Sequence, residues 1–215
     1  MNAFRLISAL LLYPTSELVE ALPLARQLSQ ALPGETAGQL APLLTHLQSH
    51  ELLTLQSRYV DWFDRQRPFS LHLFEHVYGE SRERGEAMVS LMQTYHDHGF
   101  FIAADELPDY LPLFLEFLSQ MPAEPAAGLL GEAVHVIAAV GRRLADAGNP
   151  YAGAFAALTS LSPVAPLPVS APPVRDMDEA MEVFGSGFDG MEPLLTPSAA
   201  PQPVHFYPRP APQGV

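Results

Sequence analysis

The residues best suited to chemistry in this 215-residue chain are His72, Glu75 and His76, which together spell H-x-x-E-H. On a helix, this spacing lets two imidazoles meet one Zn²⁺ with the glutamate as general base, as in inverted zinc metalloproteases. Such a site also needs a third ligand, and no obvious one follows at the spacing those enzymes use. We therefore interpret all three residues as partly buried, hydrogen-bonded groups without a metal. A zinc hydrolase is the rival hypothesis.

A second chemical motif, G-x-G-x-x-G, falls at Gly185, Gly187 and Gly190. This fingerprint binds dinucleotides when a strand precedes it and a helix follows it. Here no strand precedes it, Pro193 blocks the helix, and the acidic surroundings would repel a pyrophosphate. The sequence also has no phosphate loop, no nucleophile elbow and no credible Ser-His-Asp order. We expect no catalytic residue and no bound cofactor.

Composition and charge exclude further classes of function. The chain has no Cys, which rules out disulfides, thiol catalysis and Cys-ligated metals. Its formal net charge of −13 disfavours nucleic acid and anionic lipid, and suits a partner segment that carries positive charge. No apolar run reaches the roughly 18 residues that span a bilayer, and the opening residues lack a cleavage site. We expect a cytoplasmic protein without stable membrane insertion.

Apolar residues recur at helical spacing through most of the chain, and no segment alternates with the period of a strand. This pattern predicts an all-α fold, a single compact domain of about eight helices. Pro23 should bend or divide the second helix, and Pro112 should distort the sixth. The expected helices cover approximately residues 4–12, 16–32, 35–49, 52–67, 81–98, 107–120, 126–147 and 151–161.

The character of the sequence changes at Pro163, since 12 of the 22 prolines lie in the last 53 residues. We predict a helical domain over residues 1–161 and a Pro-rich, flexible, disordered acidic tail over residues 162–215. Within the tail, residues 162–175 should form an extended linker, and residues 176–195 a short acidic amphipathic segment. One hypothesis is that this segment occupies an apolar groove of the domain when no partner is bound.

Aromatic side chains are frequent between residues 59 and 114, and most of them should belong to the core. They are interleaved with acidic residues, which suggests an apolar groove with an acidic rim for a basic amphipathic helix. The acidic residues in question are Asp61, Asp64, Glu75, Glu80 and Asp109.

Three stretches carry a resemblance to a known family. Residues 59–65 read YVDWFDR, residues 106–120 read ELPDYLPLFLEFLSQ, and residues 73–85 contain LFEH-x-x-GES-R-x-RG. Together they resemble the nitrate reductase delta-type (NarJ-type) assembly chaperones, within the wider set of molybdoenzyme maturation chaperones. The sequence departs from the family pattern at His72, Tyr78 and Glu86.

The resemblance implies an all-helical cytoplasmic protein without catalytic activity or a cofactor of its own. Its partner would be the catalytic alpha subunit of a respiratory nitrate reductase, bound in its apo form through an N-terminal, leader-like segment. Binding would support insertion of the molybdenum cofactor and assembly of the membrane complex, with cofactor-delivery proteins as further partners. A helical adaptor with another partner is the alternative.

The candidate site follows from the aromatic cluster and the family motif together. Gly79, Ser81 and Gly85 are expected to be structural residues of the motif. The predicted peptide-binding residues are Tyr59, Phe63, Phe74, Glu75, His76, Tyr78, Glu80, Arg82, Arg84, Met88 and Tyr110.

Overall fold

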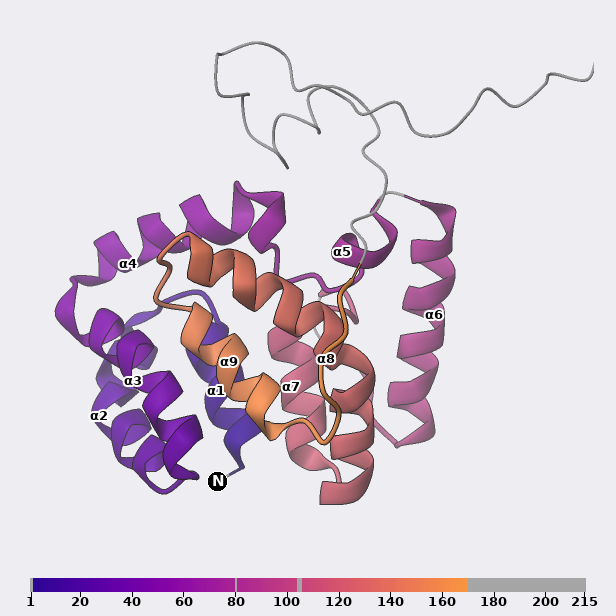
Figure 1. The fold of residues 1–215 in the computed structure, drawn as a ribbon, viewed down its shortest axis with the longest axis horizontal. Helices are drawn as coiled ribbons and strands as arrows, with labels where there is room; N and C mark the ends of the chain where they lie inside the picture. Colours follow the sequence, from indigo (N-terminus) through magenta and orange to yellow (C-terminus); the bar gives the residue numbers. More distant parts are fainter. Residues whose placement is uncertain (1, 80, 104–105, 170–215) are drawn as a thin grey trace, which may run out of the picture. The chain divides into compact units, whose positions relative to one another are not determined.

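The computed structural model of the chain describes residues 2–79, 81–103 and 106–169, and all regular secondary structure within these ranges is helical (Figure 1). The predicted all-α fold is thereby confirmed, with one short helix, α5, beyond the expected eight. The helices are α1 (Ala3–Leu11), α2 (Ser16–Gln30), α3 (Gly34–Ser49), α4 (Leu52–Tyr59), the π-helix η1 (Val60–Asp64), the 3-10 helix η2 (Arg67–Phe69), α5 (Glu75–Tyr78), α6 (Arg82–Asp97), α7 (Leu111–Gln120), α8 (Ala123–Asp146) and α9 (Ala152–Leu161).

The chain divides into two units, residues 1–175 and 176–215. The second unit lies wholly outside the described residues, as does residue 80. The hypothesis about the acidic segment 176–195 and the glycine motif at Gly185, Gly187 and Gly190 therefore both fall outside the described residues.

The core is built around α1 and α9. The apolar stripe of α1, with Ile7, Leu10 and Leu11 fully buried, packs against α7. Helix α9 lies between α3 and α8 (Figure 1). Gly153 makes the approach to α3 possible, because a side chain there would collide with the backbone oxygen of Gln39. The small residues of α9 therefore bring two helices together at backbone distance.

The prolines disturb the helices less than the sequence suggests. Helix α2 continues through Pro23 from Ser16 to Gln30, so the expected division is wrong. Pro23 is exposed, where the carbonyl left without a partner can bond water. Helix α7 begins at Leu111 rather than at 107, which places Pro112 in its first turn. Proline is tolerated there because the N–H groups of a first turn have no intrahelical acceptor, so the missing N–H costs no hydrogen bond.

A π-helix interrupts the fourth predicted helix. The chain leaves the α-helical path at Val60, whose carbonyl accepts the Arg65 N–H at 3.1 Å. Tyr59 at the end of α4 and the two aromatic residues of the π-helix meet the ring of Tyr151, at centroid distances of 6.1 Å for Tyr59, 5.9 Å for Trp62 and 4.9 Å for Phe63. The wider turn thus belongs to a packed aromatic cluster.

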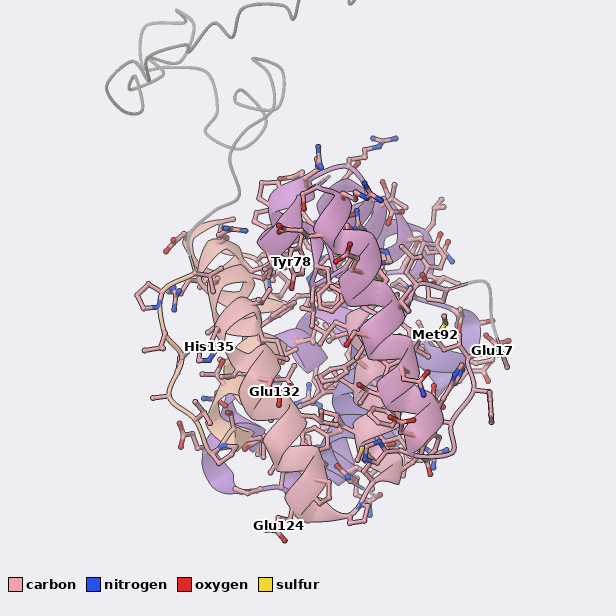
Figure 2. The ribbon with its side chains drawn as sticks, turned by 90° about the vertical axis from the view of Figure 1, so that its right-hand side faces the viewer. Glu17, Tyr78, Met92, Glu124, Glu132 and His135 are labelled. Carbon is pink, nitrogen blue, oxygen red and sulfur yellow. The ribbon has the colours of Figure 1, made fainter. Side chains whose placement is uncertain are left out.

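Residues 162–169, called the strap from here on, pack along α8. Val164 lies over Gly131, where an added Cβ would approach it to 2.9 Å. One helical turn further, the Leu167 N–H donates to His135 Nδ1 at 2.9 Å (Figure 2). The first residues of the expected linker therefore follow the domain surface.

Among the described helices, α8 is long and apolar enough to cross a membrane by length and composition alone. In this fold its inward side chains, among them Leu130, Val134, Ile137 and Leu144, are fully buried in the core of the helical domain.

Candidate functional site

A groove with a cavity of about 390 Å³ opens between α6 and α8. Figure 2 looks toward these two helices, with Tyr78 near the α5 end of the groove and Glu132 on α8. His135 lies on the other flank of α8, beside the strap. The described lining residues are Leu73, Phe74, Val77 and Tyr78 around α5, Ala87, Ser90, Leu91 and Thr94 of α6, Asp109, Phe114 of α7, and Leu129, Glu132, Ala133 and Val136 of α8.

Helix α6 forms one wall of the groove, with its firmest attachments near its two ends and partly buried Leu91 packed against the core between them. Within α6, which the structure describes throughout, Tyr95 is the single fully buried residue. Its hydroxyl donates to the Pro108 carbonyl at 2.6 Å, and its ring lies 4.5 Å from that of Phe117. Near the other end, Arg84 Nη2 donates to Glu75 Oε1 at 3.1 Å. Between these anchors the helix stands apart from α8.

Asp109 fixes the floor of the site. Its carboxylate is fully buried, and its Oδ2 accepts the Phe74 N–H at 2.9 Å. Its Oδ1 lies 3.3 Å from His72 Nδ1, and this hydrogen bond raises the pKa of His72. The expectation that Asp109 belongs to an exposed acidic rim is wrong. The sequence did not show that a backbone N–H and an imidazole would form hydrogen bonds to the Asp109 carboxylate and so allow its burial.

The backbone strengthens the same connection. Leu73 N–H donates to the Asp109 carbonyl at 3.1 Å, and Leu111 N–H donates to the Leu71 carbonyl at 2.8 Å. His72 and Tyr110 form an isolated antiparallel bridge. The segment before α5 and the segment before α7 are thus held as one unit, although about 35 residues separate them along the chain.

His76 lies on α5 and is buried as a neutral group. Its Nε2 lies 2.9 Å from the Ser70 carbonyl, and its Nδ1 lies 3.1 Å from Arg143 Nη1. Because arginine only donates, Nδ1 accepts and Nε2 carries the proton. Burial, with a further contribution from the charge of Arg143, lowers the pKa of His76.

The geometry of H-x-x-E-H differs from that of a zinc motif. His72 precedes the four-residue α5, and both ring nitrogens of His76 are engaged by protein groups. In the ranges 2–79, 81–103 and 106–169, no group of three or more His, Asp or Glu side chains is arranged to hold a metal ion.

The buried imidazole of His76 predicts a loss of stability in acid. Its pKa is lower in the folded chain than in the unfolded one, so the unfolded state binds the extra proton as the pH falls below about 6.5. We expect His76→Gln to flatten the dependence of the free energy of unfolding on pH, by up to about 1.4 kcal/mol per pH unit. Urea denaturation at pH 7.5 and 5.5 measures this. His96→Gln, on exposed α6 surface, controls for loss of an imidazole, and equal slopes for His76→Gln and the parent would contradict the assignment.

A second cavity, called the aromatic pocket from here on, has a volume of about 230 Å³. It lies across the hydrogen-bonded pair of His72 and Asp109 from the groove, since His72 lines the pocket and Asp109 lines the groove. The Tyr59 hydroxyl donates to the Leu11 carbonyl at 2.9 Å and lies 3.3 Å from the Tyr110 hydroxyl. The described lining residues are Tyr13, Tyr59, Phe63, Asp64, Leu71, His72, Glu106 and Tyr110.

Five of the eleven predicted peptide-binding residues line one of the two cavities. Phe74 and Tyr78 line the groove, with the ion pair of Glu75 and Arg84 close to them in the chain. The aromatic pocket collects the predicted residues Tyr59, Phe63 and Tyr110. Three other predicted residues line neither cavity: His76 is buried on α5, Arg82 is exposed, and Met88 is half-buried on α6. Glu80 lies outside the described residues.

The three predicted structural residues have different surroundings. Gly79 ends α5 with φ 55° and ψ −128°, a conformation that disfavours every residue with a side chain. Ser81 is the N-cap of α6, and its N–H donates to the Tyr78 carbonyl at 3.0 Å. Gly85 is exposed on α6, where an added Cβ would meet no neighbour.

Sequence reasoning missed the contribution of α8 to the groove. Leu129, Ala133 and Val136 recur at helical spacing, but the predicted site included none of them. The available signal was that α8 is apolar on more than its core-facing side. Arg143 was missed as well, because nothing in the sequence indicates that it reaches His76.

The comparison with known proteins agrees with the motifs. The family model described as nitrate reductase delta subunit matches residues 29–157, and the chain belongs to this family. The matched region runs from the end of α2 into α9 and includes all of the groove. The resemblance seen in the sequence is thereby confirmed.

Similar curated proteins carry the names of assembly chaperones. The chain is 39% identical over 164 residues to the nitrate reductase molybdenum cofactor assembly chaperone NarJ of Escherichia coli K12, covering 73% of this chain and 68% of that protein. It is 38% identical over 162 residues to the probable chaperone NarW of the same strain, covering 75% and 68%. A probable NarJ of Bacillus subtilis is 31% identical over 153 residues, covering 69% and 82%.

Proposed function

We propose that this chain is an assembly chaperone for a respiratory nitrate reductase, acting in the cytoplasm without catalysis. Its client is the apo catalytic alpha subunit, and its ligand is the leader-like N-terminal segment of that subunit. Holding this segment supports insertion of the molybdenum cofactor and assembly of the membrane complex. The names of the relatives support the chaperone role, and the groove between α6 and α8 supports the binding of a peptide.

The groove suits one face of an amphipathic helix. Phe74, Leu91 and Val136 contribute apolar walls from three different elements, and a helix presents side chains at i, i+3, i+4 and i+7 to such a surface. Tyr95 is the one fully buried residue of α6, a helix that the structure describes in full. Because so little of α6 is buried, the helix can shift and the width of the groove can adapt to the ligand.

Charge supports a basic ligand. The chain carries a formal net charge of −13, and Glu132 lies in the groove wall. Opposite charges increase the rate of encounter and fix the orientation of the bound segment, and salt weakens both effects. We therefore expect affinity for the client segment to fall as ionic strength rises.

Blocking the groove tests the proposal. Ala133→Phe places a ring between α8 and α6, and we expect it to weaken binding of a synthetic client segment of about 15 residues by at least about tenfold, or 1.4 kcal/mol. Isothermal titration calorimetry of the full chain measures the affinity. Ala123→Phe, exposed at the start of the same helix, is the matched control.

Two results would count against the groove. One is equal affinity for Ala133→Phe and the parent chain when both are shown by circular dichroism to be folded. The other is no heat of binding from the folded parent at high peptide concentration.

A further inference from the structure

We propose that the aromatic pocket is a subsite for a guanidinium group, that of an arginine side chain presented by a bound polypeptide. The pocket combines four aromatic residues with two carboxylates in a space of about 230 Å³. Binding of a guanidinium follows from the geometry of the pocket alone. Its use by the client segment rests on the function proposed above.

The walls of the pocket are aromatic. Tyr59 and Phe63 form its buried floor, with ring centroids 4.8 Å apart. Tyr13 stands edge-on to Tyr59 at 5.5 Å and is 44% exposed, so the pocket opens to solvent beside it. Ring faces attract cations, and they attract a planar guanidinium by stacking as well.

The charge of the pocket is negative. Asp64 and Glu106 line it, and among the described lining residues none is Arg or Lys. Both carboxylates act on the pocket's interior: the pKa of Tyr110 is raised by burial and then by the charges of Glu106 and Asp64. The one basic group among the described lining residues, His72, is hydrogen-bonded to the carboxylate of buried Asp109. A cation is therefore the ligand that fits.

The size of the pocket selects a side-chain tip. At about 230 Å³ it is smaller than the roughly 300–1,000 Å³ typical of sites for whole small molecules. A guanidinium can donate to two carboxylates while its plane lies against a ring, whereas an ammonium is a compact, strongly hydrated charge. We therefore expect a preference for arginine over lysine.

Small probes test the pocket without any client. We expect N-acetyl-arginine amide to bind the full chain in the low-millimolar range, with saturable chemical-shift changes in NMR spectra, and N-acetyl-citrulline amide to bind at least about tenfold more weakly. Asp64→Asn combined with Glu106→Gln should weaken arginine binding by at least about fivefold. Tyr13→Leu, a change at the exposed rim, should weaken it as well.

The control is Asp61→Asn, which removes a nearby exposed carboxylate paired with Arg65 and should leave arginine binding unchanged. Equal binding of the arginine and citrulline amides would overturn the proposal. So would unchanged arginine binding in both the Asp64→Asn/Glu106→Gln and the Tyr13→Leu variants.

The groove variant keeps this proposal separate from the proposed function. Ala133→Phe should leave binding of N-acetyl-arginine amide unchanged, because Ala133 lines the groove and not the pocket. If the client segment fails to bind but the arginine amide binds as expected, the chaperone proposal fails and the subsite stands. If the segment binds but the amide does not, the subsite fails alone.

Discussion

Replacing Asp109 with alanine is expected to lower the free energy of unfolding by about 3 kcal/mol. The change removes a fully buried carboxylate that accepts the Phe74 N–H at 2.9 Å and lies 3.3 Å from His72 Nδ1. It leaves the Phe74 N–H without its acceptor. It also creates a cavity where the carboxylate stood. Urea denaturation followed by circular dichroism measures the effect.

Two further variants separate charge from shape at this position. Asp109→Asn keeps the size of the side chain and an oxygen for the Phe74 N–H but loses the attraction to His72, so we expect a smaller loss, of about 1–2 kcal/mol. Asp61→Ala removes one member of the exposed pair with Arg65 and should cost less than about 1 kcal/mol. Similar losses for Asp109→Ala and Asp61→Ala would show that Asp109 does not hold the two segments together.

Replacing Gly153 with alanine is expected to destabilise the domain by about 2–3 kcal/mol. The added Cβ would collide with the backbone oxygen of Gln39, so α9 and α3 must move apart along their contact. Because α9 also packs against α8, the displacement reaches the centre of the core. For a domain of this size, we expect a melting temperature lower by about 5–10 °C, measured by differential scanning calorimetry.

Gly38→Ala is the matched control for this substitution. Gly38 lies on α3, the helix that faces Gly153, is exposed, and has no neighbour that an added Cβ would meet. There alanine should stabilise the helix by about 0.5–1 kcal/mol, because glycine loses more conformational freedom on folding. If both variants shift the melting temperature in the same direction, the close contact at Gly153 is not rigid.

The all-α fold was predictable because its helices are amphipathic and their apolar residues repeat with helical period. The stripe of Ile7, Leu10 and Leu11 is fully buried in the structure, as such a stripe should be. Helix boundaries were less accessible, since Pro108 and Pro112 both suit a first turn and only tertiary contacts place the start of α7 at Leu111. The π-helix at Val60–Asp64 left no recognisable signal.

The candidate site was predictable in its aromatic residues but not in its division. Sequence spacing placed Tyr59, Phe74 and Tyr110 in one groove, whereas the structure separates the groove from the aromatic pocket at Asp109 and His72. Periodicity records which residues avoid water, and it does not record which surface they face. The same limit explains why a buried aspartate was taken for an exposed one.

The position of Trp62 gives the protein an optical probe of its own. It is the only tryptophan in the sequence, and its ring lies 5.6 Å from that of His46 and 5.9 Å from that of Tyr151. Its emission spectrum should therefore report the contact between α3, the π-helix and the start of α9. Trp62 follows Tyr59 and precedes Phe63 of the aromatic pocket, but it does not line the groove. A ligand that binds near the aromatic pocket should therefore change this fluorescence, whereas one bound between α6 and α8 should not. The two binding sites can thus be told apart with no label attached to either partner.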